Sequence, residues 1–278
     1  MRIAVLSGKG GAGKTFVAVN LAVSADHAVY IDCDVEEPNG HLFLKPEDIS
    51  QKQVSTLLPA FNPEKCTGCR KCVDFCRFNA LIYIKKKPKV FPEVCHSCGG
   101  CELVCPEGAV SSVEHPVGMV QTGHHKDTTV VSGILNLGEA SGVPVIHEAM
   151  KTGMSLGDNV IIDCPPGSAC PVMESLTEAD FAVLVAEPTA FGFHNFKMVY
   201  ELVNLMHKPC GVVINKMDAP YEPLEAFCQV HELPVLLRIP YEPETAQLGA
   251  EGKIICEEDP EMAQRFQELL RKIGGKLS

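Results

Sequence analysis

Short apolar runs rich in Val and Ile recur along most of the chain, separated by segments that have a helical pattern. The runs contain few polar alternations, which is typical of strands buried on both faces of a parallel sheet. We predict strands at residues 2–7, 28–34, 159–164, 181–187, 210–215 and 235–239. The intervening helices begin with residues 14–25, so the pattern predicts a doubly wound, mostly parallel α/β sheet.

Two later segments add to this sheet and close it. Residues 116–123 and 129–137 have strand patterns joined by His124-His125-Lys126-Asp127, and we predict a hairpin that returns the chain to the sheet. Residues 260–273 form a helical pattern with one apolar stripe, which consists of Met262, Phe266, Leu269, Leu270 and Ile273. The polar face mixes Glu with Arg and Lys, so this helix is expected to close the core and not to lie on a membrane.

A block of eight cysteines interrupts the pattern between residues 66 and 105, as two copies of C-x2-C-x2-C-x3-C. In two-cluster ferredoxins with this spacing, three thiolates of a run bind one [4Fe-4S] cluster and the fourth binds the neighbouring cluster. The predicted ligands are Cys66, Cys69, Cys72 and Cys105 for one cluster, and Cys95, Cys98, Cys101 and Cys76 for the other. Zinc is the alternative, because C-x2-C pairs also bind zinc, but the duplicated run with a trailing fourth cysteine favours clusters.

The cysteine block predicts a small inserted α+β ferredoxin domain over residues 60–115, which divides the host domain into residues 1–59 and 116–278. Arg77 follows Cys76 where the ferredoxin pattern has proline. Its backbone N–H and positive charge are expected to raise the potential of the cluster that Cys76 binds. Outside the block, we expect ordinary buried cysteines at five positions, namely Cys33, Cys164, Cys210, Cys228 and Cys256.

A glycine-rich loop follows the first predicted strand and opens the first predicted helix. Residues 8–15 read GKGGAGKT and fit G-x-x-x-x-G-K-[ST], in the structural context that this phosphate-binding motif requires. Glycines let backbone N–H groups surround a phosphate, Lys14 offers a charge to the terminal phosphates, and Thr15 can hold Mg²⁺. The motif predicts ATP or ADP with Mg²⁺ at Gly8, Gly10, Gly11, Ala12, Gly13, Lys14 and Thr15.

Lys9 places a second lysine in the loop, and K-G-G-x-G-K-T resembles the deviant phosphate loop of the MinD, ParA, Mrp and nitrogenase iron-protein superfamily. Residues 31–39 (IDCDVEEPN) resemble the first switch, residues 160–167 (VIIDCPPG) the Walker B strand and second switch, and residues 213–218 (VINKMD) the adenine-reading segment. With the cysteine block between the switches, essentially the whole chain resembles MinD-superfamily P-loop ATPases that contain an inserted ferredoxin domain.

The resemblance implies a nucleotide-dependent dimer, formed by two copies or with a paralogue. Lys9 would then reach the phosphates of the partner and Asp34 would position the attacking water, so that Lys9, Lys14 and Asp34 are the catalytic residues. It further implies that Asp32 and Asp163 support Mg²⁺ together with Thr15, and that the nucleotide site includes Asn215, which reads adenine, and also Gly167 and Lys216. From the residues alone, Asp32 and Asp34 are equally explained as carboxylates at the end of a strand.

Cys170 follows Asp163 by seven residues, in a position that resembles that of a cluster-binding cysteine of the nitrogenase iron protein. No second cysteine clearly supplies the other half of that pair, so a cluster that bridges two subunits through Cys170 is the less favoured interpretation of this residue. A structural role is the alternative.

Charge narrows the range of partners. The 278-residue chain has a net charge of −11, and residues 60–115 hold eight Lys and Arg against six Asp and Glu, which leaves −13 for the rest. Nucleic acid is disfavoured because it needs a broad basic surface. The basic residues 85–89 (KKKPK) are predicted to be a solvated hairpin tip, with docking of an acidic redox partner as the alternative.

Localisation follows from the ends of the chain and from its thiols. No apolar run is long enough for a membrane span, and the phosphate loop begins seven residues after Met1, so we expect neither a membrane anchor nor a signal peptide. Clustered free cysteines in such a chain are typical of a reducing compartment, which predicts a cytoplasmic protein.

We expect an ATP-dependent iron-sulfur redox protein, in which ATP binding and hydrolysis gate electron transfer from two [4Fe-4S] clusters to an acceptor. The alternative is a scaffold or carrier ATPase of the Mrp type, which delivers iron-sulfur or other metal clusters to an acceptor protein. A positioning ATPase like MinD or ParA is disfavoured by the cysteine block and by the missing membrane or DNA surface.

Overall fold

A computed structural model describes residues 1–85 and 87–277. Its strands are β1 (Arg2–Leu6), β2 (Val29–Asp32), β3 (Glu47–Phe61), β4 (Leu81–Ile84), β5 (Lys87–Val90), β6 (Val110–His125), β7 (Thr128–Leu135), β8 (Val160–Asp163), β9 (Phe181–Ala186), β10 (Cys210–Met217) and β11 (Val235–Pro240). Its helices are α1 (Lys14–Ser24), α2 (Gly40–Leu44), α3 (Lys71–Phe75), α4 (Gly100–Leu103), α5 (Val143–Met154), α6 (Cys170–Thr177), α7 (Ala190–Leu205), α8 (Glu222–Val230), α9 (Pro243–Ala250), α10 (Ile255–Glu258) and α11 (Pro260–Leu277), with a 3-10 turn at Pro92–Val94.

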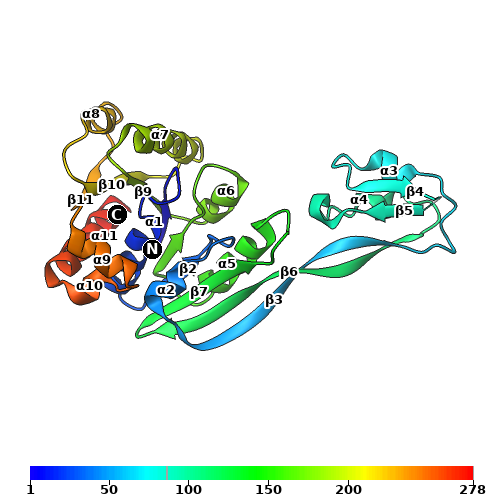
Figure 1. The fold of residues 1–278 in the computed structure, drawn as a ribbon, viewed down its shortest axis with the longest axis horizontal. Helices are drawn as coiled ribbons and strands as arrows, with labels where there is room; N and C mark the ends of the chain where they lie inside the picture. Colours follow the sequence, from blue (N-terminus) through cyan, green and yellow to red (C-terminus); the bar gives the residue numbers. More distant parts are fainter. Residues whose placement is uncertain (86, 278) are drawn as a thin grey trace.

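A large sheet organises the molecule (Figure 1). Within the described residues it has nine strands in the order β11-β10-β9-β1-β8-β2-β7-β6-β3. Neighbouring strands pair in parallel from β11 to β7, whereas β6 runs antiparallel to both β7 and β3. The predicted doubly wound, mostly parallel α/β fold is therefore confirmed, as are the predicted strands of its centre.

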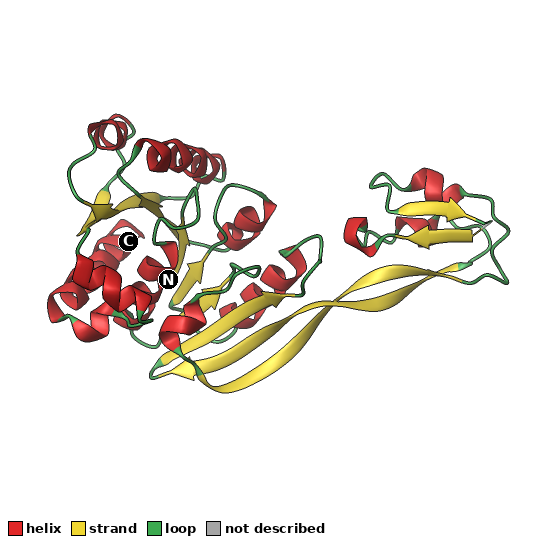
Figure 2. Cartoon of the chain, in the orientation of Figure 1, coloured by secondary structure: helices red, strands yellow, loops and turns green. Residues whose placement is uncertain are grey.

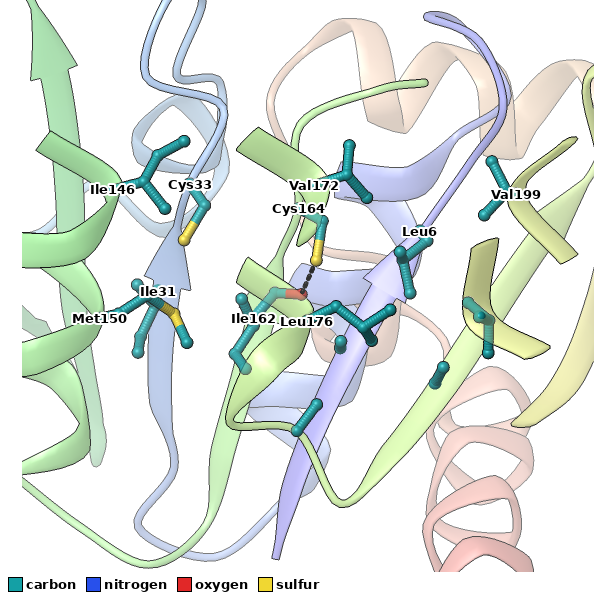
Figure 3. Close-up of a cluster of buried hydrophobic side chains, with 14 of the residues drawn as sticks. Leu6, Ile31, Cys33, Ile146, Met150, Ile162, Cys164, Val172, Leu176 and Val199 are labelled. Atoms are coloured by element: carbon teal, nitrogen blue, oxygen red, sulfur yellow. Dashed lines mark hydrogen bonds between the residues drawn. The ribbon is translucent and has the colours of Figure 1, made fainter. Parts of the chain in front are cut away.

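Helices cover both faces of the sheet, because side chains alternate along each buried strand. In β1, Ala4 and Leu6 face the core formed with α5, α6 and α7, while Ile3 and Val5 face the core formed with α1 and α11. Figure 3 shows the first core, where Leu6, Ile31 and Ile162 from three neighbouring strands meet the side chains of the covering helices. Burial on both faces explains why these strands have continuous apolar sequences.

The C-terminal helix α11 has the predicted apolar stripe. Met262, Phe266, Leu269 and Ile273 are buried in the second core, and Leu270 packs against that core. None of the helices in the described residues is long and apolar enough to cross a bilayer.

The predicted hairpin is present as β6 and β7, with β6 extending through His125 so that the turn is shorter than expected. We did not predict β3, which is one of the two edge strands of the sheet within the described residues. Its sequence, EDISQKQVSTLLPAF, is mostly polar and most of its side chains are exposed. The strand lacks an apolar signal because so little of it is covered.

Beyond the sheet, β3 and β6 continue as a two-stranded ribbon (Figure 2). β3 pairs with β6 as far as Phe61↔Val110, whereas β6 pairs with β7 only from Gly118 onward. At about 3.3 Å per residue, the free part of the ribbon, residues 55–61 with 110–116, spans roughly 23 Å. The cysteine block lies at its far end with α3, α4 and the β4–β5 hairpin (Figure 1).

Both strands of the ribbon include an expected domain boundary, since β3 continues through residue 60 and β6 through residue 115. The chain enters and leaves the insert at neighbouring positions, since Asn62 N donates to Ala109 O at 2.8 Å. In the basic segment 85–89, Lys85 after the end of β4 and Lys87 at the start of β5 are exposed, while Lys86 lies outside the described residues.

We expect the host domain to fold without the insert. Among the described residues, neither hydrophobic core includes a side chain between residues 61 and 110. Replacing residues 63–108 by Asn-Gly, which favours a tight hairpin turn, should therefore leave cooperative urea unfolding and nucleotide binding in place and should abolish iron binding.

The matched control is Phe266→Ala in the otherwise intact chain, which empties a fully buried position in the core of the host domain. It should lower the free energy of unfolding by about 3–5 kcal/mol. An excised protein that aggregates or unfolds without cooperativity would show that the insert is part of the host core.

Candidate functional site

The glycine-rich loop joins β1 to α1 in a conformation that needs glycine. Gly11 and Gly13 have φ values of 81° and 91°, a region that disfavours residues with a side chain. A Cβ atom on Gly13 would lie only 2.0 Å from Asn215 Nδ2. The loop thus bends tightly at the N-terminus of α1, where free backbone N–H groups and the helix dipole favour an anion.

Lys14 lies in a buried group of carboxylates. Its Nζ is 2.5 Å from Asp163 Oδ1 and 3.6 Å from Asp34 Oδ2, and the side chain is only 6% exposed. Burial by itself lowers the pKa of Lys14, but the charges of Asp163, Asp32 and Asp34 outweigh burial and raise the pKa above its ordinary value. Lys14 therefore stays charged and holds the carboxylates together.

Asp32 and Asp163 occupy the ends of the adjacent strands β2 and β8 and pair in register. Asp32 accepts hydrogen bonds from Asp34 N at 3.1 Å and Gly40 N at 2.9 Å, and Asp163 accepts one from the Tyr30 hydroxyl at 2.9 Å. Burial and the neighbouring Asp163 raise the pKa of Asp32 to about 7, although Lys14 and the two backbone donors oppose this. A divalent cation near these oxygens would relieve the repulsion, and oxygen ligands suit Mg²⁺.

A cavity of about 600 Å³ opens above this charged group. Its wall combines the glycine-rich loop, Thr15, the first switch at Asp34 and the second switch at Pro165 and Pro166. Gly142 and Ile146 also line it, and sequence reasoning missed both because they carry no motif. The elements predicted to bind the nucleotide thus surround one cavity, with Asp32 and Asp163 fully buried next to it.

The Lys9 side chain contacts residues of its own chain. Its Nζ lies 2.7 Å from Glu187 Oε2 and 5.1 Å from the ring centre of Phe191. Glu187 follows β9 and Phe191 lies in the first turn of α7, so their only sequence signal is a position after a buried strand. To act on a second subunit, Lys9 must exchange these contacts for new ones.

The remaining predicted nucleotide-site residues make hydrogen bonds to the glycine-rich loop or to the residue before it. Asn215 is 5% exposed and donates through Nδ2 to Ala12 O at 2.9 Å, and Lys216 Nζ donates to Gly11 O at 2.7 Å. Gly167 has a φ of 95° and its N donates to Ser7 O at 3.0 Å. Lys216 lines the cavity, whereas the other contacts brace the loop against β10 and the second switch.

Tyr30 contacts one of the buried carboxylates, and the sequence analysis did not identify it. It lies within β2, is fully buried, and its hydroxyl fixes one oxygen of Asp163. Burial and the charges of Asp163 and Asp32 raise the pKa of the Tyr30 hydroxyl well above its ordinary value, so it remains a hydrogen-bond donor. In the sequence, the only feature that distinguishes Tyr30 is that it is a tyrosine within a continuous apolar run.

The cysteines of the insert gather in two sets. Cys76, Cys95, Cys98 and Cys101 line a cavity of about 210 Å³, and Cys66, Cys69, Cys72 and Cys105 line a smaller one of about 20 Å³. Within residues 1–85 and 87–277, no group of three or more Cys, His, Asp or Glu side chains is arranged for a single metal ion. Each predicted set of four cysteines therefore lines one cavity.

The two cavities differ in their surroundings. Leu57, Pro59 and Ser112 of the ribbon line the larger cavity, while Phe61 and Val110 at the tip of the ribbon line the smaller one. The larger cavity is therefore the one nearer to the host domain. Arg77 lines this cavity beside Cys76, as expected from its position in the sequence.

The other cysteines lie apart from these sets. Cys33, Cys164 and Cys228 are buried as expected, whereas Cys210 and Cys256 are only half-buried. Cys33 and Cys164 lie in the hydrophobic core (Figure 3), and burial raises the pKa of both thiols. Cys170 is exposed at the start of α6, directly after the second switch.

A glycine-rich loop between a strand and a helix, with a buried lysine and carboxylates at the carboxyl end of a parallel sheet, defines a P-loop nucleotide-binding protein. The sequence pattern of the CbiA family, described as the CobQ/CobB/MinD/ParA nucleotide binding domain, matches residues 3–255. The chain belongs to this family, which confirms the resemblance inferred from the four motifs.

Individual proteins agree with both parts of the chain. It is 29% identical to uncharacterized protein MJ0578 of Methanocaldococcus jannaschii, over 98% of this chain and 96% of that protein. Uncharacterized ferredoxin MJ0722 of the same organism is 37% identical over 51 residues, 17% of this chain and 66% of that protein, as fits an inserted ferredoxin domain. The structure of the cell division ATPase MinD of Pyrococcus furiosus has a TM-score of 0.61 and 21% identity, covers 99% of this chain and 98% of that one, and supports the fold.

The pKa of Asp32 predicts how stability depends on pH. In the unfolded chain this carboxyl has an ordinary pKa near 4, and in the folded chain its pKa is about 7. Between these values the folded protein binds more protons, so Asp32 makes the free energy of unfolding fall as pH rises. In chelator without nucleotide, Asp32→Asn should therefore be more stable than the unchanged protein at pH 8, and this difference should shrink at pH 5.

Urea unfolding at the two pH values measures this, with Asp158→Asn on the surface as the control for loss of a carboxylate. An Asp32→Asn difference that is the same at pH 5 and pH 8 would contradict the raised pKa.

Proposed function

We propose that the protein is an ATP-dependent iron-sulfur redox protein, in which ATP binding and hydrolysis in a dimer gate electron transfer through two [4Fe-4S] clusters to an acceptor protein. One observation carries the proposal: two sets of four thiols lie at the end of a ribbon whose strands belong to the same sheet as the nucleotide site. The chain's membership in a P-loop nucleotide-binding family supports the ATPase part.

In this proposal the backbone N–H groups of the glycine-rich loop bind the phosphates of ATP or ADP. Lys14 turns from Asp163 toward the terminal phosphates, and Thr15 holds Mg²⁺ with support from Asp32 and Asp163. Asp34, whose pKa is raised by burial against the opposing charge of Lys14, positions the attacking water. Phosphoryl transfer is promoted mainly by such positioning and charge neutralisation.

The dimer is formed by two copies of the chain or with a paralogue. Lys9 leaves Glu187 and Phe191 and contacts the phosphates bound to the partner subunit, while Asn215 and Lys216 complete the nucleotide site. Because Lys9 is only 23% exposed while paired with Glu187, dimer formation has to compete with a contact inside the chain. The nucleotide thereby decides which contact Lys9 makes.

In the insert, Cys95, Cys98, Cys101 and Cys76 hold the cluster nearer to the host domain, and Cys66, Cys69, Cys72 and Cys105 hold the outer one. A bound cluster accepts and donates single electrons. The smaller cavity requires its cysteine side chains to rotate apart to admit a cluster. Such thiols have to stay reduced until the clusters are assembled, which agrees with a cytoplasmic protein.

A cluster scaffold or carrier of the Mrp type is the second candidate. Cys170 favours it, because its exposed thiol lies directly after the second switch, where a change of nucleotide would move it. A carrier would transfer a labile cluster to an acceptor protein, whereas a redox protein keeps its clusters through each ATP cycle.

Anaerobically purified protein should contain about eight iron and eight acid-labile sulfide atoms per chain, since every thiol of both sets has a place in a cluster. Metal and sulfide analysis with the visible absorption spectrum measures this. Cys101→Ser should reduce both contents, whereas Cys170→Ser should leave them unchanged. Stoichiometric zinc without sulfide would contradict the assignment.

Nucleotide should change the redox behaviour of the clusters. A ligand shifts a redox equilibrium only if it binds the oxidised and reduced forms differently, and a typical coupling of about 1–3 kcal/mol corresponds to a roughly 5- to 150-fold change in affinity. Redox titrations without nucleotide, with ADP and with a slowly hydrolysed ATP analogue should show a shifted midpoint potential for at least one cluster.

Two lysine variants distinguish nucleotide binding from ATP hydrolysis. Lys14→Ala should weaken nucleotide binding and lose the shift at moderate nucleotide concentrations, while Lys9→Ala should keep binding and lose hydrolysis. If the midpoint potentials are the same in all three nucleotide states, and the nucleotide affinities are the same for oxidised and reduced protein, the results would favour the carrier instead.

A further inference from the structure

The ribbon has a defined root at the point where it leaves the sheet. Pairing between β3 and β6 steps from Val54↔Gly118 to Ser55↔Pro116, so Val117 is an extra residue on β6 and forms a β-bulge. Pairing of β6 with β7 ends at Gly118, one residue from the bulge. Bulges bend a strand and weaken its pairing locally, so this is where the ribbon can change direction.

The segment between β7 and α5, residues 136–142, contacts this root. Asn136 donates from its backbone N to Val117 O at 2.9 Å and from Nδ2 to Pro116 O at 3.0 Å. Glu139 Oε1 lies 3.0 Å from His115 Nε2, with the Glu139 side chain 16% exposed. Three contacts therefore join the segment to three consecutive residues of β6. Figure 1 shows this segment beside the start of the ribbon.

Leu135, the last residue of β7, and Gly142, the last residue of the segment, both contact the first switch. Leu135 N donates to Val35 O at 2.9 Å, and Val35 directly follows Asp34. A Cβ atom on Gly142 would lie 2.5 Å from Val35 Cγ2, and Val35 is only 3% exposed. Gly142 and Val35 both line the nucleotide cavity. Because packed side chains leave no free space, Val35 cannot move far unless residues 135–142 move with it.

We propose that residues 135–142 transmit the state of the nucleotide site to the ribbon, with Asn136 and Glu139 as positioning residues that set the direction of the ribbon at its bulge. The inference rests on the proposed function, because it assumes that nucleotide binding reorganises the first switch. The free ribbon spans roughly 23 Å, so each degree of rotation at the root moves its far end by about 0.4 Å. A small displacement at Val35 therefore becomes a larger displacement of both cysteine sets.

Amide hydrogen exchange on the full-length protein with its clusters tests this link. The protein is compared without nucleotide, with Mg²⁺ and ADP, and with Mg²⁺ and a slowly hydrolysed ATP analogue. In the unchanged protein, the analogue should slow exchange in peptides that cover residues 8–15 and should alter exchange in peptides that cover residues 54–57 and 113–119.

Glu139→Gln and Asn136→Ala should keep the protection of residues 8–15 and lose the nucleotide-dependent change at the ribbon root. The matched control is Glu174→Gln, which removes a similar histidine–glutamate pair, His147 Nδ1 to Glu174 Oε1 at 2.8 Å, between α5 and α6. This control should behave like the unchanged protein at both places. Two independent variants keep the test decisive if one of them folds poorly.

Three results would overturn the inference, and they separate it from the proposed function. A nucleotide-dependent change at the root that persists in both variants would show that another route carries it. Protection of residues 8–15 without any change at the root would overturn the link and leave nucleotide binding in place. No protection of residues 8–15 in the unchanged protein would overturn nucleotide binding itself, and the link with it.

Discussion

The candidate nucleotide site is organised around two carboxylates buried side by side at the ends of adjacent strands. Asp32 and Asp163 are fully buried and in register, so they repel each other where water cannot screen them. Lys14 supplies the positive charge that makes this arrangement tolerable, at 2.5 Å from Asp163. With Asp34 also close, the site still holds more negative than positive charge, which favours a divalent cation.

This charge arrangement also explains how the nucleotide could control the switches. Lys14 contacts Asp163 and Asp34 in the structure, and in the proposed function it turns toward the phosphates, so that binding of Mg²⁺ and nucleotide would redistribute its contacts. Asp34 and Val35 belong to the first switch, and Asp34 is one of the partners that Lys14 contacts. A change at Lys14 therefore reaches the segment that packs against residues 135–142.

The position of the insert is consistent with such a role. It is attached to β3 and β6, the last two strands at one side of the sheet, where an extension disturbs neither hydrophobic core among the described residues. A ribbon of two paired strands is stiffer than a single linker, because each strand is fixed by hydrogen bonds to the other. The insert therefore has a defined direction from the host domain, set where β6 parts from β7.

Much of this organisation follows from local sequence. The strands of the sheet centre were predictable because burial on both faces demands apolar runs, and the cysteine sets were predictable because their spacing reflects the crossed binding pattern of two-cluster ferredoxins. β3 was missed because an exposed ribbon needs no apolar pattern. Tyr30, Glu187 and Gly142 were missed because their importance comes from contacts with residues that are distant in sequence.

The contacts at the ribbon root are of a suitable size to carry a signal. Asn136 makes two hydrogen bonds and Glu139 makes one, to His115. A typical intramolecular hydrogen bond contributes about 0.5–1.5 kcal/mol. Their sum is comparable with the roughly 1–3 kcal/mol of coupling found in allosteric proteins. Much stronger contacts would hold the ribbon in one direction whatever nucleotide is bound, and much weaker ones would let it move independently of the switch.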